Sequence, residues 1–171
     1  MRILLIAVTA LLVIVGLVLV IGAMLPRQHR ATREITLNRS PREIYSVARD
    51  FGSAPSWRRN LLQVEWPDPA NGLVRFREVS KDGSVNYEIV EDTPGEKLIT
   101  RIVDRDLGYS GSWIYEFSPA EKGTRVRITE DGEVSNILFR FVSRFVFGHT
   151  STIDSYLRAL GGKFGENVTP K

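Results

Sequence analysis

The chain has 171 residues, of which 23 are Lys or Arg, 20 are Asp or Glu and none is Cys. This length allows one folded domain and an appendage, and the lack of Cys excludes disulfides, a Cys-ligated zinc site and a Cys nucleophile. Four basic residues and no acidic ones precede Glu34, so 19 basic residues balance 20 acidic ones in the remainder. A nucleic-acid-binding protein concentrates basic residues on its folded domain, so this class is disfavoured.

Residues 3–25 are an uncharged, apolar run at the N-terminus. A helix of this length crosses a hydrocarbon core about 30 Å thick. The run is longer than the apolar region of a secretory signal, and residues 22–26 are a poor cleavage site. We therefore expect a single-pass membrane anchor from Ile3 to Leu25, with residues 1–30 as anchor and basic juxtamembrane segment. A long signal peptide is the alternative, and a slight excess of positive charge after the run favours a cytoplasmic C-terminal domain.

A strand and two short helices are expected after the anchor. Apolar and polar residues alternate within residues 31–37, as they do in a half-buried strand. Residues 40–43 are a capping box with proline at the first helical position, and apolar residues at helical spacing follow as far as Phe51. After Gly52, residues 53–60 are expected to form a second short helix that carries Trp57.

Six further strands are expected, each bounded by turn-forming residues. They cover residues 61–66, 73–79, 85–91, 98–104, 112–117 and 124–130. Close spacing with hairpin turns indicates an antiparallel sheet. A terminal helix begins near residue 135, with Gly148 as a point where it can bend or divide. Its wheel places one set of apolar residues on a common face: Leu138, Phe141, Val142, Phe145, Ile153, Tyr156, Leu157 and Leu160. The elements together indicate an α+β domain over residues 31–166, followed by a tail at 167–171.

This order of elements resembles the START-like, or SRPBCC, superfamily, specifically its polyketide cyclase/dehydrase and lipid-transport branch. The stretches that carry the resemblance are residues 35–45, 50–57, 111–117, 123–126 and 130–133, the last leading into Phe141, Phe145 and Gly148. The resemblance implies a helix-grip fold, in which a curved antiparallel sheet wraps around a long C-terminal helix. Members typically hold an apolar ligand between the two. Because the superfamily includes lipid carriers, hormone and quinone binders, aromatase/cyclases and proteins with no known ligand, the fold does not choose the function.

Aromatic side chains that alternate along two of the strands are candidates for the wall of a ligand cavity. They include Tyr87 on one strand, and Trp113 and Tyr115 on another. The alternative is ordinary core packing against the terminal helix. The full set of candidate ligand-binding residues is Trp57, Tyr87, Trp113, Tyr115, Glu130, Phe141, Phe145, His149 and Tyr156.

Two polar residues are the candidates for acid–base chemistry. Glu130 continues the inward alternation of its strand, so it either points inward or stands in water at the strand end. An inward carboxylate needs a partner, for which the candidates are Arg75, Arg77 and Arg101; without one its pKa would rise. His149 lies in a helically spaced row with Thr152 and Tyr156 that can bind a polar ligand head or transfer protons, or it is structural. His29 is expected to be solvated.

No Ser-His-Asp order, phosphate loop, dinucleotide fingerprint or metal-ligand spacing is apparent, so no catalytic residue, cofactor or metal is assigned. The first hypothesis is a membrane-tethered module that binds a lipid, isoprenoid or quinone-like molecule. The second is a cyclase/dehydratase-type enzyme in which Glu130, His149 or Tyr115 act as acid and base. The third is an anchored interaction domain whose cavity is collapsed. A roomy pocket would favour the binding module, and convergent acid–base groups would favour the enzyme. Large aromatic residues that fill the gap between sheet and helix would favour the interaction domain.

Overall fold

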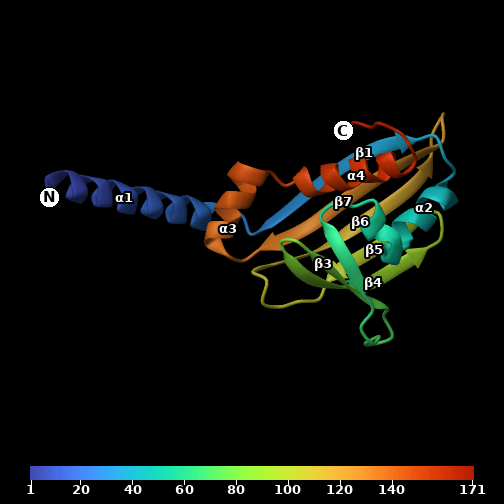
Figure 1. Cartoon of the computed structure of the whole chain (residues 1–171), viewed down its shortest axis with the longest axis horizontal. Coiled ribbons are helices and arrows are strands. Elements are labelled where there is room, and N and C mark those ends of the chain that lie inside the picture. The colour runs from blue at the N-terminus through green and yellow to red at the C-terminus, as the bar shows by residue number, and fades with distance from the viewer.

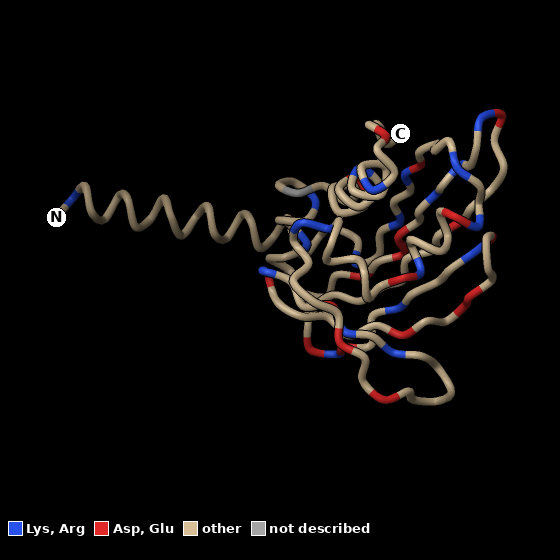
Figure 2. The backbone as a smooth tube through the Cα atoms, turned by 45° about the vertical axis from the view of Figure 1, so that its right-hand side comes forward, with Lys and Arg blue, Asp and Glu red and all other residues tan. Residues whose placement is uncertain are grey.

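The computed structural model describes residues 1–171, with the exception of the side chain of Phe147. An isolated helix, α1 (Arg2–Met24), projects from one end of an α+β domain (Figure 1). By length and composition α1 is able to cross a membrane, a property that signal sequences share. Figure 2 shows that charged residues are absent from α1 between Arg2 and the domain, whereas both signs of charge are spread over the domain itself.

The domain is built on one seven-stranded antiparallel sheet. Its strands are β1 (Gln28–Leu37), β2 (Leu61–Glu65), β3 (Arg75–Ser80), β4 (Gly83–Thr93), β5 (Lys97–Ile102), β6 (Tyr109–Pro119) and β7 (Thr124–Val134). They lie in the order β1-β7-β6-β5-β4-β3-β2, so every hairpin connects neighbours and β1 closes against β7. The antiparallel sheet predicted from the turn spacing is confirmed. β1 begins three residues earlier than predicted, because Gln28 to Arg30 pair with residues 131–133 of β7.

The short helices follow β1. The predicted capping box at the start of α2 (Pro41–Arg49) is present: Glu43 N donates to Ser40 Oγ at 3.4 Å, and Ser40 N donates to Glu43 Oε2 at 2.9 Å. The second helix is a 3-10 turn, η1 (Phe51–Ser56), which begins earlier than residues 53–60. It begins there because Asp50 caps it, accepting from Ser53 N at 3.2 Å.

The terminal helix is divided at Gly148. It consists of α3 (Ile137–Val142), a π-helical turn η2 (Ser143–Phe147) and α4 (Ser151–Lys163). Gly148 has a φ of 72°, which a helix interior does not allow. The helical wheel therefore holds only within α4, where Ile153 and Leu157 are fully buried, while Leu138 and Phe145 before the break are 54% and 60% exposed.

The core lies between α4, α2 and the concave face of the sheet. Figure 1 shows α4 lying over β1 and β7, and α2 near the far end of the sheet from α1. The fully buried side chains include Leu37, Ile44, Leu98, Ile128 and Leu157, contributed by both helices and three of the strands. This arrangement is the helix-grip α+β fold that the resemblance implied.

Candidate functional site

Four of the predicted ligand-binding residues meet around the ring of Tyr156 on α4. The centroid of that ring lies 5.5 Å from Trp57, 5.7 Å from Trp113 and 5.6 Å from Tyr115, and all three contacts are edge-on. Strand alternation brings Trp113 and Tyr115 to the concave face, and the turn after η1 delivers Trp57. We call these four side chains the Tyr156 cluster. Edge-to-face contacts between aromatic rings are energetically favourable. The four rings pack against one another in the gap between the sheet and α4.

A second aromatic group adjoins the first on β3 and β4. Tyr87, also predicted, stacks on Phe76 at 5.1 Å, and Phe76 stacks on Phe51 at 4.0 Å. Phe76 and Phe51 were not among the predicted site residues. The alternation of β3 is the signal that places Phe76 inward, on the face that carries Tyr87 of the paired strand.

An ion pair that the sequence analysis did not predict borders the Tyr156 cluster. Arg58 binds Glu78 through both terminal guanidinium nitrogens, Nη1 donating to Oε1 and Nη2 donating to Oε2 at 3.0 Å. The guanidinium carbon lies 5.4 Å from the centroid of Tyr156, over its ring. Burial by itself lowers the pKa of Arg58, but the charge of Glu78 and its hydrogen bonds outweigh that effect and raise it, so the guanidinium stays charged. A positive charge held against an aromatic wall can attract an electron-rich ligand group.

The tyrosines of the site remain protonated at neutral pH. Burial is the main cause that raises the pKa of Tyr87, of Tyr115 and of Tyr156, and the carboxylate of Glu78 adds to the effect in each case. These phenols are therefore hydrogen-bonding groups and not bases under ordinary conditions.

The indole nitrogen of Trp57 is buried and has no hydrogen-bond partner among the described residues. Leaving a buried donor unpaired costs about 1–3 kcal/mol, so such atoms are rare in folded proteins. An acceptor oxygen on a bound molecule would satisfy this donor. Arg75 Nε is a second buried nitrogen without a partner, but Arg75 belongs to the opposite face of β3.

A polar group lies beside the aromatic one and is centred on Glu130. The carboxylate accepts from His29 Nε2 at 3.1 Å and from Trp113 Nε1 at 2.9 Å. The ring of His149 stacks on that of His29 with centroids 4.2 Å apart. Glu130 thus points inward, one of the two alternatives considered. We call Glu130, His29 and His149 the histidine–carboxylate group.

The partners of Glu130 differ from the arginines considered in the sequence analysis. Arg75 and Arg101 lie within 4 Å of Glu88 instead, and Arg77 lies 3.5 Å from Glu65. They cannot reach Glu130 because alternation turns them toward the outer face of the sheet.

His29 is largely buried, which corrects the expectation that it is solvated. Its side chain is 15% exposed. The early start of β1 places it on the concave face opposite Gly132, where a Cβ would lie only 2.3 Å from His29 Cε1. A glycine at residue 132 therefore lets the imidazole lie flat on β7.

His149 precedes α4 and does not continue it, so the predicted row with Thr152 and Tyr156 is not formed: Thr152 is exposed and Tyr156 is buried. Burial is the main cause that lowers the pKa of His149. The neighbouring His29 and Arg144 lower it further, and Glu130 raises it. The imidazole is therefore neutral at pH 7 and able to accept a proton.

The remaining predicted residues, Phe141 and Phe145, lie in α3 and η2 and contact each other at 4.9 Å. Neither contacts the rings of the Tyr156 cluster within the described aromatic pairs. Phe145 is one of the more exposed apolar side chains of the domain.

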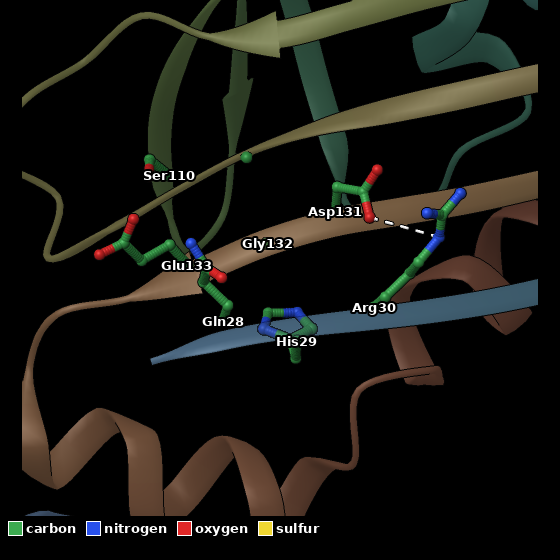
Figure 3. Close-up of a pocket in the computed structure, with 8 residues that line it drawn as sticks. Gln28, His29, Arg30, Ser110, Asp131, Gly132 and Glu133 are labelled. Atoms are coloured by element: carbon green, nitrogen blue, oxygen red, sulfur yellow. Dashed lines mark ion pairs between the residues drawn. The ribbon is translucent and has the colours of Figure 1, made fainter. Parts of the chain in front are cut away.

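A hollow of about 510 Å³ lies at the paired ends of β1, β7 and β6 (Figure 3). Its lining is mostly polar and includes the ion pair of Arg30 with Asp131, whose atoms lie 3.4 Å apart. Alternation puts Arg30, Asp131 and Glu133 on the face opposite Tyr156, so this hollow is separate from the aromatic gap. In the part of the chain that the structure describes, no three His, Asp or Glu side chains converge as metal ligands.

The fold is shared with solved proteins of low sequence similarity. An aromatase/cyclase, Zhui from Streptomyces sp. R1128, is 12% identical with a TM-score of 0.62, over 80% of this chain and 93% of that one. A START superfamily protein from Mycobacterium smegmatis is 16% identical with a TM-score of 0.59, over 79% and 96%. The di-domain aromatase/cyclase StfQ of the steffimycin pathway is 12% identical with a TM-score of 0.61, and the match covers 79% of this chain but only 50% of StfQ.

No curated protein is significantly similar to this chain. A family model described as polyketide cyclase/dehydrase and lipid transport matches residues 28–159, from the first residue of β1 into α4. The match covers more than half of the chain and includes both the Tyr156 cluster and the histidine–carboxylate group. The chain therefore belongs to the polyketide cyclase/dehydrase and lipid transport family, and it shares its fold with a START superfamily protein.

Proposed function

We propose that this protein is a membrane-anchored module that binds an apolar molecule carrying an acceptor oxygen, of the lipid, isoprenoid or quinone type. The ligand would enter the gap of the Tyr156 cluster. The observation that carries this proposal is the buried, unpartnered Nε1 of Trp57 inside an otherwise aromatic surface. A mainly apolar site with a few directed polar groups is typical of small-molecule binding.

The gap is packed by aromatic side chains, so binding requires some of them to move. Trp57, Tyr87 and Trp113 are only partly buried, whereas Tyr115 and Tyr156 are buried. A ligand can therefore displace the three partly buried side chains at the lowest cost in free energy. Tyr115 and Tyr156 would stay in place beneath the ligand. This proposal differs from the collapsed-cavity hypothesis in requiring that displacement.

The test is native mass spectrometry of the detergent-solubilised full chain with decylubiquinone and oleic acid as probes, together with extraction of any co-purified molecule. We expect one bound molecule per chain. Trp57→Phe keeps the ring and removes the donor, so affinity should fall about tenfold, the value of roughly one hydrogen bond. Trp66→Phe is the matched control, because Trp66 is exposed outside the cluster. A folded chain that takes up neither probe and carries no extracted molecule would overturn the proposal and favour an interaction domain.

Attachment to the membrane is the second part of the proposal, and the junction between α1 and the domain supports it. Arg140 of α3 is 6% exposed and donates to Gly22 O at 3.1 Å and to Leu25 O at 3.0 Å. If the chain were cleaved between Gly22 and Leu25, as a secretory signal is, the buried guanidinium of Arg140 would lose the acceptor Gly22 O. The arrangement therefore favours an uncleaved anchor.

The orientation of the anchor is a separate question. The basic residues after α1 favour a cytoplasmic domain. The thiol accessibility of a cysteine placed at exposed Asp82 would test this orientation in intact cells.

Acid–base catalysis is a second candidate function, and the histidine–carboxylate group favours it. A neutral His149 stacked on a His29 that hydrogen-bonds to Glu130 places proton acceptors at the edge of the Tyr156 cluster. Such an array could remove and return protons in a cyclisation or dehydration. Conversion of a bound probe into a new species, lost in Glu130→Gln with binding retained, would favour the enzyme over the binding module.

A further inference from the structure

The segment of α3 and η2, residues 137–147, presents an apolar surface that the domain does not cover. Ile137, Leu138, Phe139, Phe145 and Val146 are between 38% and 66% exposed. Residues 134–153 include no acidic residue. Leu138 lies in α3, and Phe145 and Val146 lie in the η2 turn that follows it directly. We call residues 137–147 the α3–η2 segment.

This segment is attached to the end of α1. Figure 1 shows it running across the C-terminal end of α1, where α1 meets the domain. Gly22 permits the contact, because a Cβ at that position would lie 2.5 Å from the carbonyl oxygen of Ile137. The guanidinium of Arg140 joins the two parts: it binds Gly22 O and Leu25 O on one side, and Val134 O and Ser135 O, each at 3.1 Å, on the other.

The apolar surface of the segment is continuous with that of α1. The side chains along α1 are exposed almost throughout, and α3 packs against its end. Basic residues accompany the apolar ones, with Arg27 just after α1 and an exposed Arg144 in η2. Apolar and aromatic residues mixed with basic ones are typical of helices that lie in the interface of an anionic bilayer. Other exposed apolar side chains of the domain, such as Leu62 and Trp66, belong to β2 and the loop after it.

We propose that the α3–η2 segment lies in the headgroup region of the bilayer that holds α1, with Leu138, Phe145 and Val146 reaching the acyl chains. The inference rests on the proposed anchoring by α1 and adds a second, interfacial attachment. It also assigns Phe145 to lipid contact. Since only Gly148 separates His149 from this segment, the histidine–carboxylate group then lies close to the membrane surface.

The absence of Cys from the chain makes the test direct. Single cysteines replace Phe145, Leu12 of α1 or Leu62 of β2 in the full chain, and each carries an NBD fluorophore. The protein is reconstituted in vesicles of phosphatidylcholine and phosphatidylglycerol, and quenching by doxyl-labelled lipids is compared with quenching by aqueous iodide. Leu62 is the matched control, because it is exposed to a similar degree as Phe145.

We expect the label at residue 145 to be quenched several-fold more by doxyl lipid than the label at residue 62, and to be shielded from iodide. If residue 12 is in lipid and residue 145 is in water, the interfacial attachment is overturned and the anchor stands. If both labels are in water, the anchor fails and the interfacial attachment fails with it. All three substituted side chains are exposed, so we expect each variant to keep the fold of the parent protein. Circular dichroism of each variant checks this.

Discussion

The ion pair of Arg58 and Glu78 holds two charges where the Tyr156 cluster excludes most water. The two side chains are 25% and 13% exposed. Glu78→Gln would leave the guanidinium without its counter-charge, and removal of one partner of a buried pair typically costs about 3 kcal/mol or more. We expect a marked loss of stability in urea denaturation of the full chain in detergent. The control is Glu65→Gln, which breaks the exposed pair with Arg77 and should cost less than about 1 kcal/mol.

A histidine whose pKa is lowered by folding makes stability depend on pH with a definite sign. Burial, His29 and Arg144 lower the pKa of His149 from its ordinary 6.5, against the opposing effect of Glu130. The unfolded chain therefore binds the proton more readily, so stability is complete above 6.5 and decreases as the pH falls through 6.5 toward the lower, folded pKa. We expect the melting temperature to fall between about pH 7.5 and about pH 5.5, and to fall less in His149→Gln. An unchanged pH dependence in that variant would contradict the assignment.

The division of the terminal helix at Gly148 separates two elements with different surroundings. Leu157 in α4 is fully buried, whereas Leu138 in α3 is mostly exposed. Leu157→Ala should therefore cost about 2–5 kcal/mol, the usual range for a buried leucine. Leu138→Ala should change the free energy of unfolding by less than about 0.5 kcal/mol in detergent, because Leu138 is already mostly exposed in the folded protein. Chemical denaturation of both variants measures the difference, and equal costs would show that the two halves pack as one helix.

The elements were predictable to the extent that their signals are local. Alternation and turn residues predicted all seven strands, and the spacing of Ser40 and Glu43 predicted the start of α2. The helical wheel extended across Gly148 because the wheel assumes a constant 100° rotation, which a residue at φ 72° interrupts. The first residues of β1 are polar, with no alternation to mark them, and become strand only through pairing with β7.

The candidate site was predictable in its aromatic part and much less so in its polar part. Trp113 was placed inward by strand alternation and Tyr156 by helical spacing, and the structure brings both together with Trp57, which follows η1. The partners of Glu130 depend on a strand pairing that spans about a hundred residues, with His29 separated from Glu130 by 101 positions. Inward alternation gave the direction of Glu130 but not what it contacts. Arg58 and Glu78 are likewise ordinary charged residues until tertiary packing joins them.

At the scale of the whole molecule, Arg140 joins α1 to the domain by hydrogen bonds. Its guanidinium donates to the carbonyls of Gly22 and Leu25 at the end of α1 and to those of Val134 and Ser135 at the end of β7. Arg140→Gln shortens the side chain and removes the charge and most of the donors, so we expect α1 to move relative to the sheet. Spin labels on cysteines placed at Leu12 and Asp82 should give a narrow distance distribution in the parent protein and a broad one in the variant. Equally narrow distributions would mean that the contact of Gly22 with Ile137 is sufficient.

The connection between α1 and β1 is only three residues long, from Leu25 to Arg27. Such a stretch spans at most about 10 Å when fully extended. With α1 fixed in one bilayer, the sheet has no tether with which to swing across to a second membrane. If α1 is anchored and the domain binds an apolar ligand, as proposed, that ligand would have to reach the domain from the same bilayer or from another carrier.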